Sequence, residues 1–369
     1  MSRPRDLHPV AWWLWAIGLA TAASFTTNPL VLLLLVGVAA LVVALRRSEQ
    51  PWGESFRLYL WLGVVIVVVR VGFRLFFGGY FGGRVLLDLP TVPLPGWVEG
   101  ITVLGPIYAQ ALLFALYDGL RLATIVICVG AANSMANPKR LLRSVPSALY
   151  EIGTALVVAV TVLPQFAESL RRVRAAQTLR AGETGRVGRL RRILVPVLED
   201  ALERSLALAA GMDARGYGRA GDATPAQRRV TGGLLLAGLV GICVGVYAVL
   251  DTTAPRVLAL PMLVFGVGAA VGGLRSAGRR VERTRYRPDP WGWPELAVAG
   301  SGVLTGTLGW WLSEHQVEVA YPPLDAFPTL SAAALALGAV ALVGALCSPS
   351  PARPYAAVPV ATLREEVAA

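Results

Sequence analysis

A polar segment rich in arginine, residues 165–230, separates two groups of long apolar runs. Such runs are typical of membrane-spanning helices, since a helix needs about 20 apolar residues to cross the hydrocarbon core of a bilayer. The chain is also 55% hydrophobic and only 15% charged, whereas about 25% of the residues of soluble proteins are charged. We therefore predict an all-α polytopic membrane protein with about eight transmembrane helices. The expected spans are residues 10–27, 30–45, 58–77, 106–131, 233–250, 257–274, 296–312 and 330–346.

The charges of the loops predict the orientation of the chain. The net charge is +11, and arginine supplies nearly all of the positive charge, because Lys139 is the only lysine. Segments 139–143, 165–230 and 275–287 are basic and should lie in the cytoplasm, while loop 313–327 has no lysine or arginine and should lie outside. Both termini are then cytoplasmic, and the protein crosses the lipid bilayer of the cell membrane several times. No nucleic-acid partner is expected, because the cations lie beside apolar spans.

The apolar run 149–162 is not counted among these spans. It is short, Pro164 follows it, and the segments on both sides of it are basic. A single crossing would place one of these basic segments outside the cell, against the positive-inside rule. We therefore expect a helix that lies at the cytoplasmic interface or dips into the membrane from that side.

Two long amphipathic helices are expected within and around the polar segment. The first covers Gln165–Arg180, and Gly182 can end it. The second covers Arg189–Arg215, where apolar residues recur on one helical face. Gly216 and Gly218 stop it, and we expect Gly216 to form a left-handed cap. We expect an antiparallel or crossed pair on the cytoplasmic side. The chain then divides into N-terminal transmembrane helices (1–135), a cytoplasmic or interfacial helical region (136–230), and C-terminal transmembrane helices with a cytoplasmic tail (231–369).

Two opposite charges lie inside the expected fourth span. Asp118 and Arg121 are three residues apart and therefore share one helix face. They can form an internally neutralised pair that faces other helices. The alternative is a pathway or gating site, because charged residues inside a membrane are usually functional. The sequence leaves both interpretations open.

The sequence nominates no catalytic or metal site. It lacks the phosphate-binding loop G-x-x-x-x-G-K-S/T, the zinc motif H-E-x-x-H and the nucleophile motif G-x-S-x-G. Cys128, Cys243 and Cys347 are isolated within apolar runs, and His8 and His315 are the only histidines. We therefore expect no enzyme activity, no cofactor and no bound metal in this chain.

The ends of the two amphipathic helices carry a recognisable signature. The second helix ends in Ala214-Arg215-Gly216, and the first ends in the related but altered stretch from Ala176 to Arg180. Asn137-Pro138, Val145-Pro146, Leu163-Pro164 and His8-Pro9 add to the pattern. With these motifs, residues 8–250 resemble the T component of energy-coupling factor (ECF) transporters, the EcfT/CbiQ family.

The resemblance implies a coupling role. In that family, two cytoplasmic coupling helices end in Ala-Arg-Gly signatures, and each end docks on one of two cytosolic ABC ATPase subunits. Ala214, Arg215, Gly216, Ala176 and Arg180 would then form the ATPase-coupling sites. ATP-driven motion would pass through this chain to a membrane S component that binds the substrate, a vitamin or a metal ion. The last 100 residues or so extend beyond the usual family pattern.

Two other functions remain open at the sequence level. A membrane enzyme that acts on lipid-linked anionic substrates could use the arginines of residues 165–230 to hold the headgroups. A membrane scaffold without a transport role would need the same arginines only for topology and for contact with anionic lipid. Neighbouring ATPase genes or co-purifying ATPase chains would favour the coupling function.

Overall fold

The computed structural model describes residues 6–47, 55–78, 82–90, 102–144, 149–179, 186–217, 224–251, 256–278, 289 and 291–349. These residues are almost entirely helical and form two compact units. Unit 1 combines the two ends of the chain, Met1–Leu141 and Asp289–Ala369, and unit 2 is Leu142–Pro288. Residues 1–141 and 289–369 therefore pack into one unit, whereas the division predicted from the sequence places the N-terminal and C-terminal helices in separate regions.

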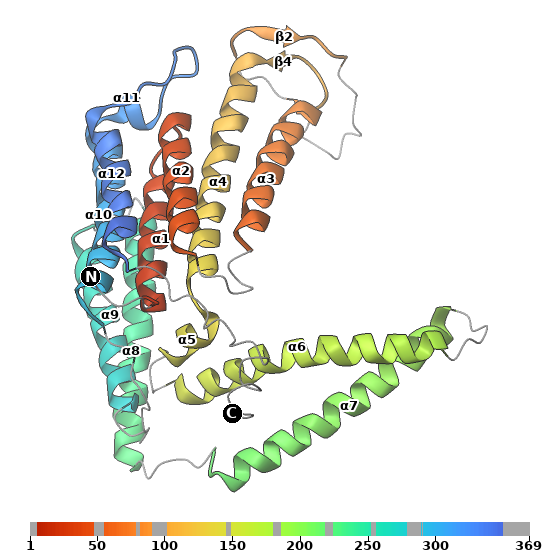
Figure 1. The fold of residues 1–369 in the computed structure, drawn as a ribbon. Helices are drawn as coiled ribbons and strands as arrows, with labels where there is room; N and C mark the ends of the chain where they lie inside the picture. The colour runs from red at the N-terminus through yellow and green to blue at the C-terminus, as the bar shows by residue number, and fades with distance from the viewer. Residues whose placement is uncertain are drawn as a thin grey trace, which may run out of the picture. The chain divides into compact units, whose positions relative to one another are not determined.

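Unit 1 is a bundle of long helices with short ones at its ends (Figure 1). Several helices begin at residues that fix their first turn. The side chains of His8, Asn28 and Ser331 each accept a hydrogen bond from a backbone N–H of the turn that follows, which satisfies a donor left free at a helix start. The helices are α1 (Pro9–Ser24), α2 (Pro29–Arg46), α3 (Phe56–Phe76), α4 (Ala109–Met135), α10 (Trp293–His315), α11 (Val317–Ala320) and α12 (Ala332–Cys347). The short helix α5 (Pro138–Arg143) begins in unit 1, and its last two residues belong to unit 2.

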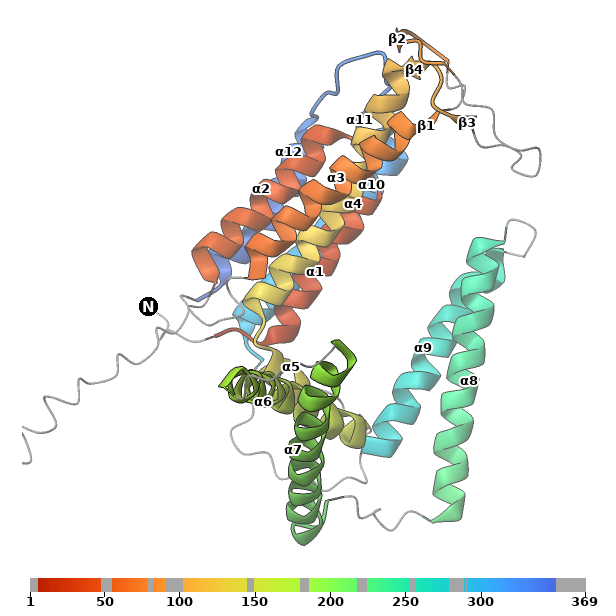
Figure 2. The same cartoon turned by 90° about the vertical axis from the view of Figure 1, so that its right-hand side faces the viewer.

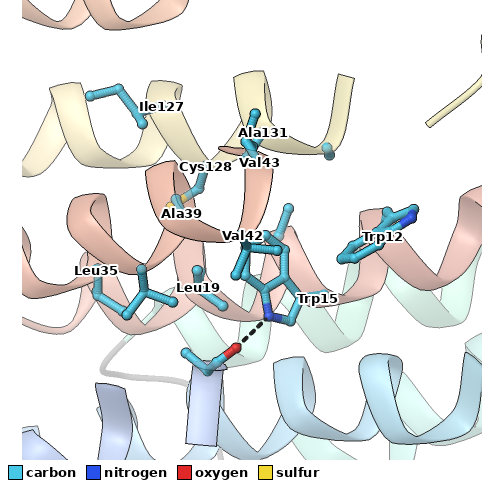
Figure 3. Close-up of a cluster of buried hydrophobic side chains, with 14 of the residues drawn as sticks. Trp12, Trp15, Leu19, Leu35, Ala39, Val42, Val43, Ile127, Cys128 and Ala131 are labelled. Atoms are coloured by element: carbon cyan, nitrogen blue, oxygen red, sulfur yellow. Dashed lines mark hydrogen bonds between the residues drawn. The ribbon is translucent and has the colours of Figure 1, made fainter. Parts of the chain in front are cut away.

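The core of unit 1 is built by helices from both ends of the chain. Trp15 of α1 is fully buried, and its indole N–H donates a hydrogen bond of 3.0 Å to the carbonyl oxygen of Ala341 in α12 (Figure 3). Helix α10 approaches α1 so closely that a Cβ built on Gly302 would overlap the backbone at Trp15. The C-terminal helices therefore complete the N-terminal bundle.

Helices α3 and α4 pack side by side and carry two small strand pairs at one end (Figure 1). Strand β1 (Phe77–Gly78) pairs with β3 (Thr102–Val103), and β2 (Val85–Leu87) pairs with β4 (Ile107–Tyr108), both antiparallel. The glycine-rich sequence here shows no alternating pattern that would have indicated these strands.

Unit 2 contains four long helices: α6 (Tyr150–Leu179), α7 (Arg186–Ala214), α8 (Pro225–Leu250) and α9 (Arg256–Gly278). Helices α8 and α9 form a tightly packed hairpin (Figure 2). A Cβ built on Gly238, Gly241 or Gly245 would lie within 3 Å of the facing helix, so the absence of side chains lets the two backbones approach. The hydroxyl oxygens of Thr231 and Ser276 lie 3.1 Å apart across the hairpin.

The expected number of eight spans is wrong. Six helices of the described residues are long and apolar enough to cross a membrane: Pro29–Arg46, Phe56–Phe76, Ala109–Met135, Ile152–Leu179, Pro225–Leu250 and Val257–Gly278. Helices α1 and α12 have 16 residues each and rise only about 24 Å, against about 30 Å of hydrocarbon. Helix α10 has 23 residues, but its many glycine, serine and threonine residues dilute its apolar character. The fold class, an all-α polytopic membrane protein, is confirmed.

The expected break at Pro164 is also corrected. The run 149–162 does not form a separate helix, because α6 continues through Pro164 for 30 residues. A proline inside a helix removes one backbone hydrogen bond and costs about 3 kcal/mol. That local penalty is outweighed by the apolar run on one side and by the contacts with α7 on the other. The same run supplies the apolar part of the candidate span Ile152–Leu179.

Candidate coupling site

Helices α6 and α7 form an antiparallel pair (Figure 1). The side-chain amide of Gln177 in α6 donates to the carbonyl oxygen of Arg192 in α7 at 3.3 Å. Ser169, eight residues before Gln177 in α6, donates to a carboxylate oxygen of Asp200. Asp200 lies eight residues after Arg192 in α7. Moving back along α6 and forward along α7 by the same number of residues leads from one contact to the other, so the two helices are antiparallel. The sequence predicted either an antiparallel or a crossed pair, and the antiparallel arrangement is confirmed.

A polar cluster fixes this register near the middle of α7. Ser169 is buried, and its hydroxyl donates to one oxygen of the Asp200 carboxylate. The other oxygen accepts from Arg204, one turn further along α7, at 3.0 Å. The hydrogen bond from Ser169 and the adjacent Arg204 guanidinium hold the pKa of Asp200 below its usual value. Arg204 follows Asp200 by four residues on the same helix face, but no local pattern pointed to Ser169.

The C-terminal end of α7 closes in a Schellman motif. The N–H of Tyr217 donates to the carbonyl oxygen of Met212 at 3.1 Å, and the N–H of Gly216 donates to Asp213 at 2.9 Å. Gly216 has a φ of 76°, which confirms the predicted left-handed cap. A Cβ built on Gly216 would meet no atom within 4 Å, so the glycine is required by the backbone conformation and not by space.

This cap presents the Ala-Arg-Gly signature to solvent. Ala214 is the last residue of α7, and Arg215 is the capping residue that follows it. Both side chains are exposed. A cationic side chain at this position meets the negative end of the helix dipole, and its flat guanidinium remains available to a partner.

The end of α6 is less completely described. Helix α6 ends at Leu179, whose side chain is 87% exposed, and Ala176 is exposed one turn earlier. Arg180 lies outside the described residues. Because the helices are antiparallel, the C-terminal ends of α6 and α7 lie at opposite ends of the pair. A helix of 29 residues is about 43 Å long, so the two signatures are widely separated.

The intramembrane charges pair between helices instead of within one. Asp118 of α4 forms an ion pair of 2.5 Å with Arg70 of α3, and the two side chains are 20% and 49% exposed. Gly119 permits this contact, since a Cβ there would lie 3.2 Å from the Cβ of Arg70. Among the ion pairs of the described residues, Asp118 appears only with Arg70 and not with Arg121. The sequence did not indicate Arg70 as the partner of Asp118. Which turns of α3 and α4 face each other cannot be read from the sequence of either helix alone.

Comparison with known protein families decides the class of the molecule. The family model of CbiQ, cobalt transport protein, matches residues 2–225. This match covers more than half of the chain. The protein belongs to the CbiQ cobalt transport protein family. A comparison with curated proteins finds no match.

Membership in the CbiQ family makes the chain a component of a membrane transport system. The matched region runs from the N-terminus to the first residue of α8, and it therefore includes the α6–α7 pair. Helices α8 to α12 lie beyond it. Within the described residues, no group of three histidine, cysteine, aspartate or glutamate side chains is placed to hold a metal ion.

Proposed function

We propose that the chain is the transmembrane coupling subunit, the T component, of an ECF-type ABC importer. In this function, cytosolic ATPase subunits bind the ends of α6 and α7. Their ATP-driven movement passes through the chain to a separate membrane S component that binds the substrate, a vitamin or a metal ion. The observation that carries the proposal is the exposed Ala214-Arg215-Gly216 end of α7, closed by a Schellman motif.

The chemistry of this helix end suits docking into a protein groove. The small side chain of Ala214 leaves the backbone approachable, and Gly216 turns the chain away from the helix axis. The guanidinium of Arg215 offers five N–H donors in a rigid fork, which matches carboxylates and carbonyl oxygens of a partner. Because the chain turns away at Gly216, this helix end can enter a cleft on a partner while the residues that follow it stay outside the cleft.

The antiparallel arrangement fits two ATPase subunits better than one. The ends of α6 and α7 lie at opposite ends of a pair about 40 Å long, so one compact subunit would not easily contact both. Two subunits that each hold one end would draw the ends together as they close on ATP. The polar contacts of Ser169 and Asp200 would keep the helices in register during this movement.

The orientation follows from charge. Residues 165–230 contain 13 arginines and no lysine, and such segments remain in the cytoplasm. We infer that α7, the polar part of α6 from Gln165 onward and both termini face the cytoplasm of the cell and that the protein resides in the cell membrane. The chain itself would bind neither ATP nor a cofactor, and catalysis would reside in the ATPase subunits.

Charge reversal at the end of α7 tests the proposal. We expect Arg215→Glu to reduce the amount of co-purifying ATPase at least tenfold, because a carboxylate would repel the groove that holds the guanidinium. Arg228→Glu is the matched control, since Arg228 is an exposed arginine at the start of α8. The measurement is a pull-down of the tagged chain from its native membrane, with every co-purifying protein identified by mass spectrometry.

The outcomes separate the possible functions. ABC ATPases together with a small hydrophobic partner would support the coupling function, and that partner would indicate the substrate. Wild-type protein that brings down no ATPase would overturn it. Equal losses from Arg215→Glu and Arg228→Glu, both relieved by added salt, would indicate binding of anionic headgroups instead.

A further inference from the structure

The candidate spans α3 and α4 of unit 1 carry a cluster of three charged side chains. Arg70 of α3 and Asp118 of α4 form the ion pair described above, and Arg121 follows Asp118 by three residues. Among the described residues, Arg121 takes part in no ion pair, and Arg70 holds the carboxylate of Asp118. Two cations and one anion leave the cluster with one excess positive charge, which Arg121 carries.

Arg121 lies near the middle of the membrane. Helix α3 has 21 residues and is therefore about 31 Å long, close to the thickness of the hydrocarbon core. Gly119 of α4 lies beside Arg70, in the last third of α3, whereas Gly130 lies beside Tyr59 at its start. The two helices are thus antiparallel. Arg121, two residues after Gly119, is level with the middle of α3, about 15 Å from either end of that helix.

Arg121 also lies at the surface of unit 1, where its side chain is partly exposed. Phe114, Asp118 and Leu122 follow one another at steps of four residues and therefore share one side of α4. Phe114 is 46% exposed and Leu122 is 44% exposed. We call these four residues, Phe114, Asp118, Arg121 and Leu122, the α4 face. It is an open, mostly apolar surface with an unneutralised cation at mid-membrane depth.

The described spans offer Arg121 no free carboxylate at this depth. The six candidate spans contain two acidic residues, Asp118 and Glu168. Arg70 holds the first, and the second lies in the polar part of α6. A second copy of the chain would bring the same excess of positive charge. A lipid phosphate lies about 15 Å away at the interface, and arginines reach the interface by snorkelling only near helix ends.

We propose that the α4 face is a docking surface for a transmembrane helix of another protein, and that this helix places an aspartate or glutamate against Arg121. Charged side chains inside a membrane usually face other helices and pair with an opposite charge. One carboxylate opposite Arg121 neutralises the cluster. Phe114 and Leu122 pack against apolar side chains of the same helix. The partner is an integral membrane protein with an acidic residue near the middle of one span.

The guanidinium of Arg121 suits a single carboxylate. Its planar fork can donate to both carboxylate oxygens at once. Because the hydrocarbon core holds no water that could solvate either group, each charge depends on the other. Lysine would keep the positive charge but lose the two parallel hydrogen bonds. We therefore expect Arg121→Lys to retain part of the binding and Arg121→Gln to lose it.

Photocross-linking of the full chain in its native membrane tests the proposal. The photoreactive residue p-benzoylphenylalanine replaces Leu122, which is exposed next to Arg121. Illumination should attach an integral membrane protein, and mass spectrometry should place the attachment on a helix that contains aspartate or glutamate. The control site is Leu41 of α2, which is 47% exposed and should attach less than a tenth as much of that protein. Adducts with lipid alone at Leu122 would overturn the proposal.

Variants of Arg121 separate a charge pair from apolar contact. Arg121→Gln should lower the yield of the cross-linked protein at least tenfold, and Arg121→Lys should lower it at most threefold. Arg57→Gln removes an exposed arginine at the start of α3 and should leave the yield unchanged. Equal yields from the wild type and a correctly folded Arg121→Gln, checked by size-exclusion chromatography, would contradict the docking surface.

A charge exchange tests the partner's acidic residue. Replacing that residue by arginine should abolish cross-linking to the wild-type chain, and Arg121→Glu should abolish it with the wild-type partner. The two changes together should restore at least half of the yield. Failure of the exchange would exclude a direct charge pair. If Arg121→Glu alone fails to fold, the exchange must also restore folding, and failure to do so would have the same meaning.

Under the proposed coupling function this partner is the S component, an identification that rests on that function. Arg121→Gln should then lose the S component while ATPases co-purify at the wild-type level, since the end of α7 is unchanged. If the wild type brings down no ATPase but the cross-link depends on Arg121, the coupling function fails and the docking surface stands. If ATPases co-purify and the cross-link is independent of Arg121, the docking surface fails and the coupling function stands.

Discussion

At the level of single residues, His8 shows how a side chain at a helix start can report on pH. Its ring nitrogen Nδ1 accepts from the N–H of Val10 at 3.3 Å, which only the unprotonated nitrogen can do. Burial lowers the pKa of His8, the Asp289 and Glu295 carboxylates oppose this effect, and the Arg140 charge adds to it. The unprotonated ring is therefore the form that the folded protein favours.

This predicts a loss of stability on acidification. The pKa of folded His8 lies below its ordinary value of 6.5, so the unfolded chain binds more protons between the two values. The stabilisation is complete above 6.5 and is lost as the pH falls through the folded pKa. We expect the thermal midpoint to fall between about pH 7 and pH 5, and less so in His8→Asn, which caps without titrating. His315→Asn is the control and should keep the wild-type slope.

The residue-level predictions succeeded where the cause was local. A glycine after Arg215 indicated a left-handed cap because no other residue adopts that conformation so readily. The partner of Asp118 was not predictable, since it depends on which turn of α3 faces α4. The contacts of Arg140 with Asp6 and Asp289 likewise join residues more than 130 positions apart. A single sequence contains no signal for such contacts.

At the level of helices, backbone approach between α1 and α10 depends on glycine. A Cβ on Gly302 would overlap the α1 backbone, whereas a Cβ on Gly300 would meet no atom within 4 Å. We expect Gly302→Ala to lower the free energy of unfolding by about 1–3 kcal/mol through overpacking. Gly300→Ala should raise it by up to about 1 kcal/mol, because alanine favours the helix. Thermal unfolding in detergent measures the change in stability of both variants. If Gly302→Ala and Gly300→Ala changed the stability equally, the close approach of α10 to α1 would be contradicted.

The helices also show where local sequence rules fail. Pro164 and the basic flanks of residues 149–162 predicted a short interfacial helix, yet α6 runs without interruption to Leu179. A proline affects one turn, whereas a helix of 30 residues gains from every other backbone bond and from its contacts with α7. The amphipathic pattern of α7 predicted its existence correctly, and its start was wrong by three residues.

At the level of the whole molecule, the C-terminal helices are part of the first bundle and not an addition to it. The family match ends at residue 225, but α10 packs against α1, and α12 packs against α2 and α10. The sequence predicted apolar helices here and gave no reason to place them beside the N-terminal ones. Their burial of Trp15 and its hydrogen bond to Ala341 explain why the bundle needs them.

This packing predicts that residues 289–369 are required for folding and can be supplied separately. Deleting them would expose Trp15, Leu19 and the other core residues of α1 that α10 and α12 help to cover, and burying one such large side chain is worth about 1.5–3 kcal/mol. We expect the chain 1–288 alone to aggregate in detergent.

Co-expression of 1–288 with 289–369 should restore a monodisperse complex, because the break falls at the boundary of unit 1 and leaves every packed helix whole. Size-exclusion chromatography distinguishes these results. A monodisperse 1–288 fragment would mean that α10 and α12 do not complete the core, while failed complementation would mean that the covalent connection before Asp289 is needed for their docking.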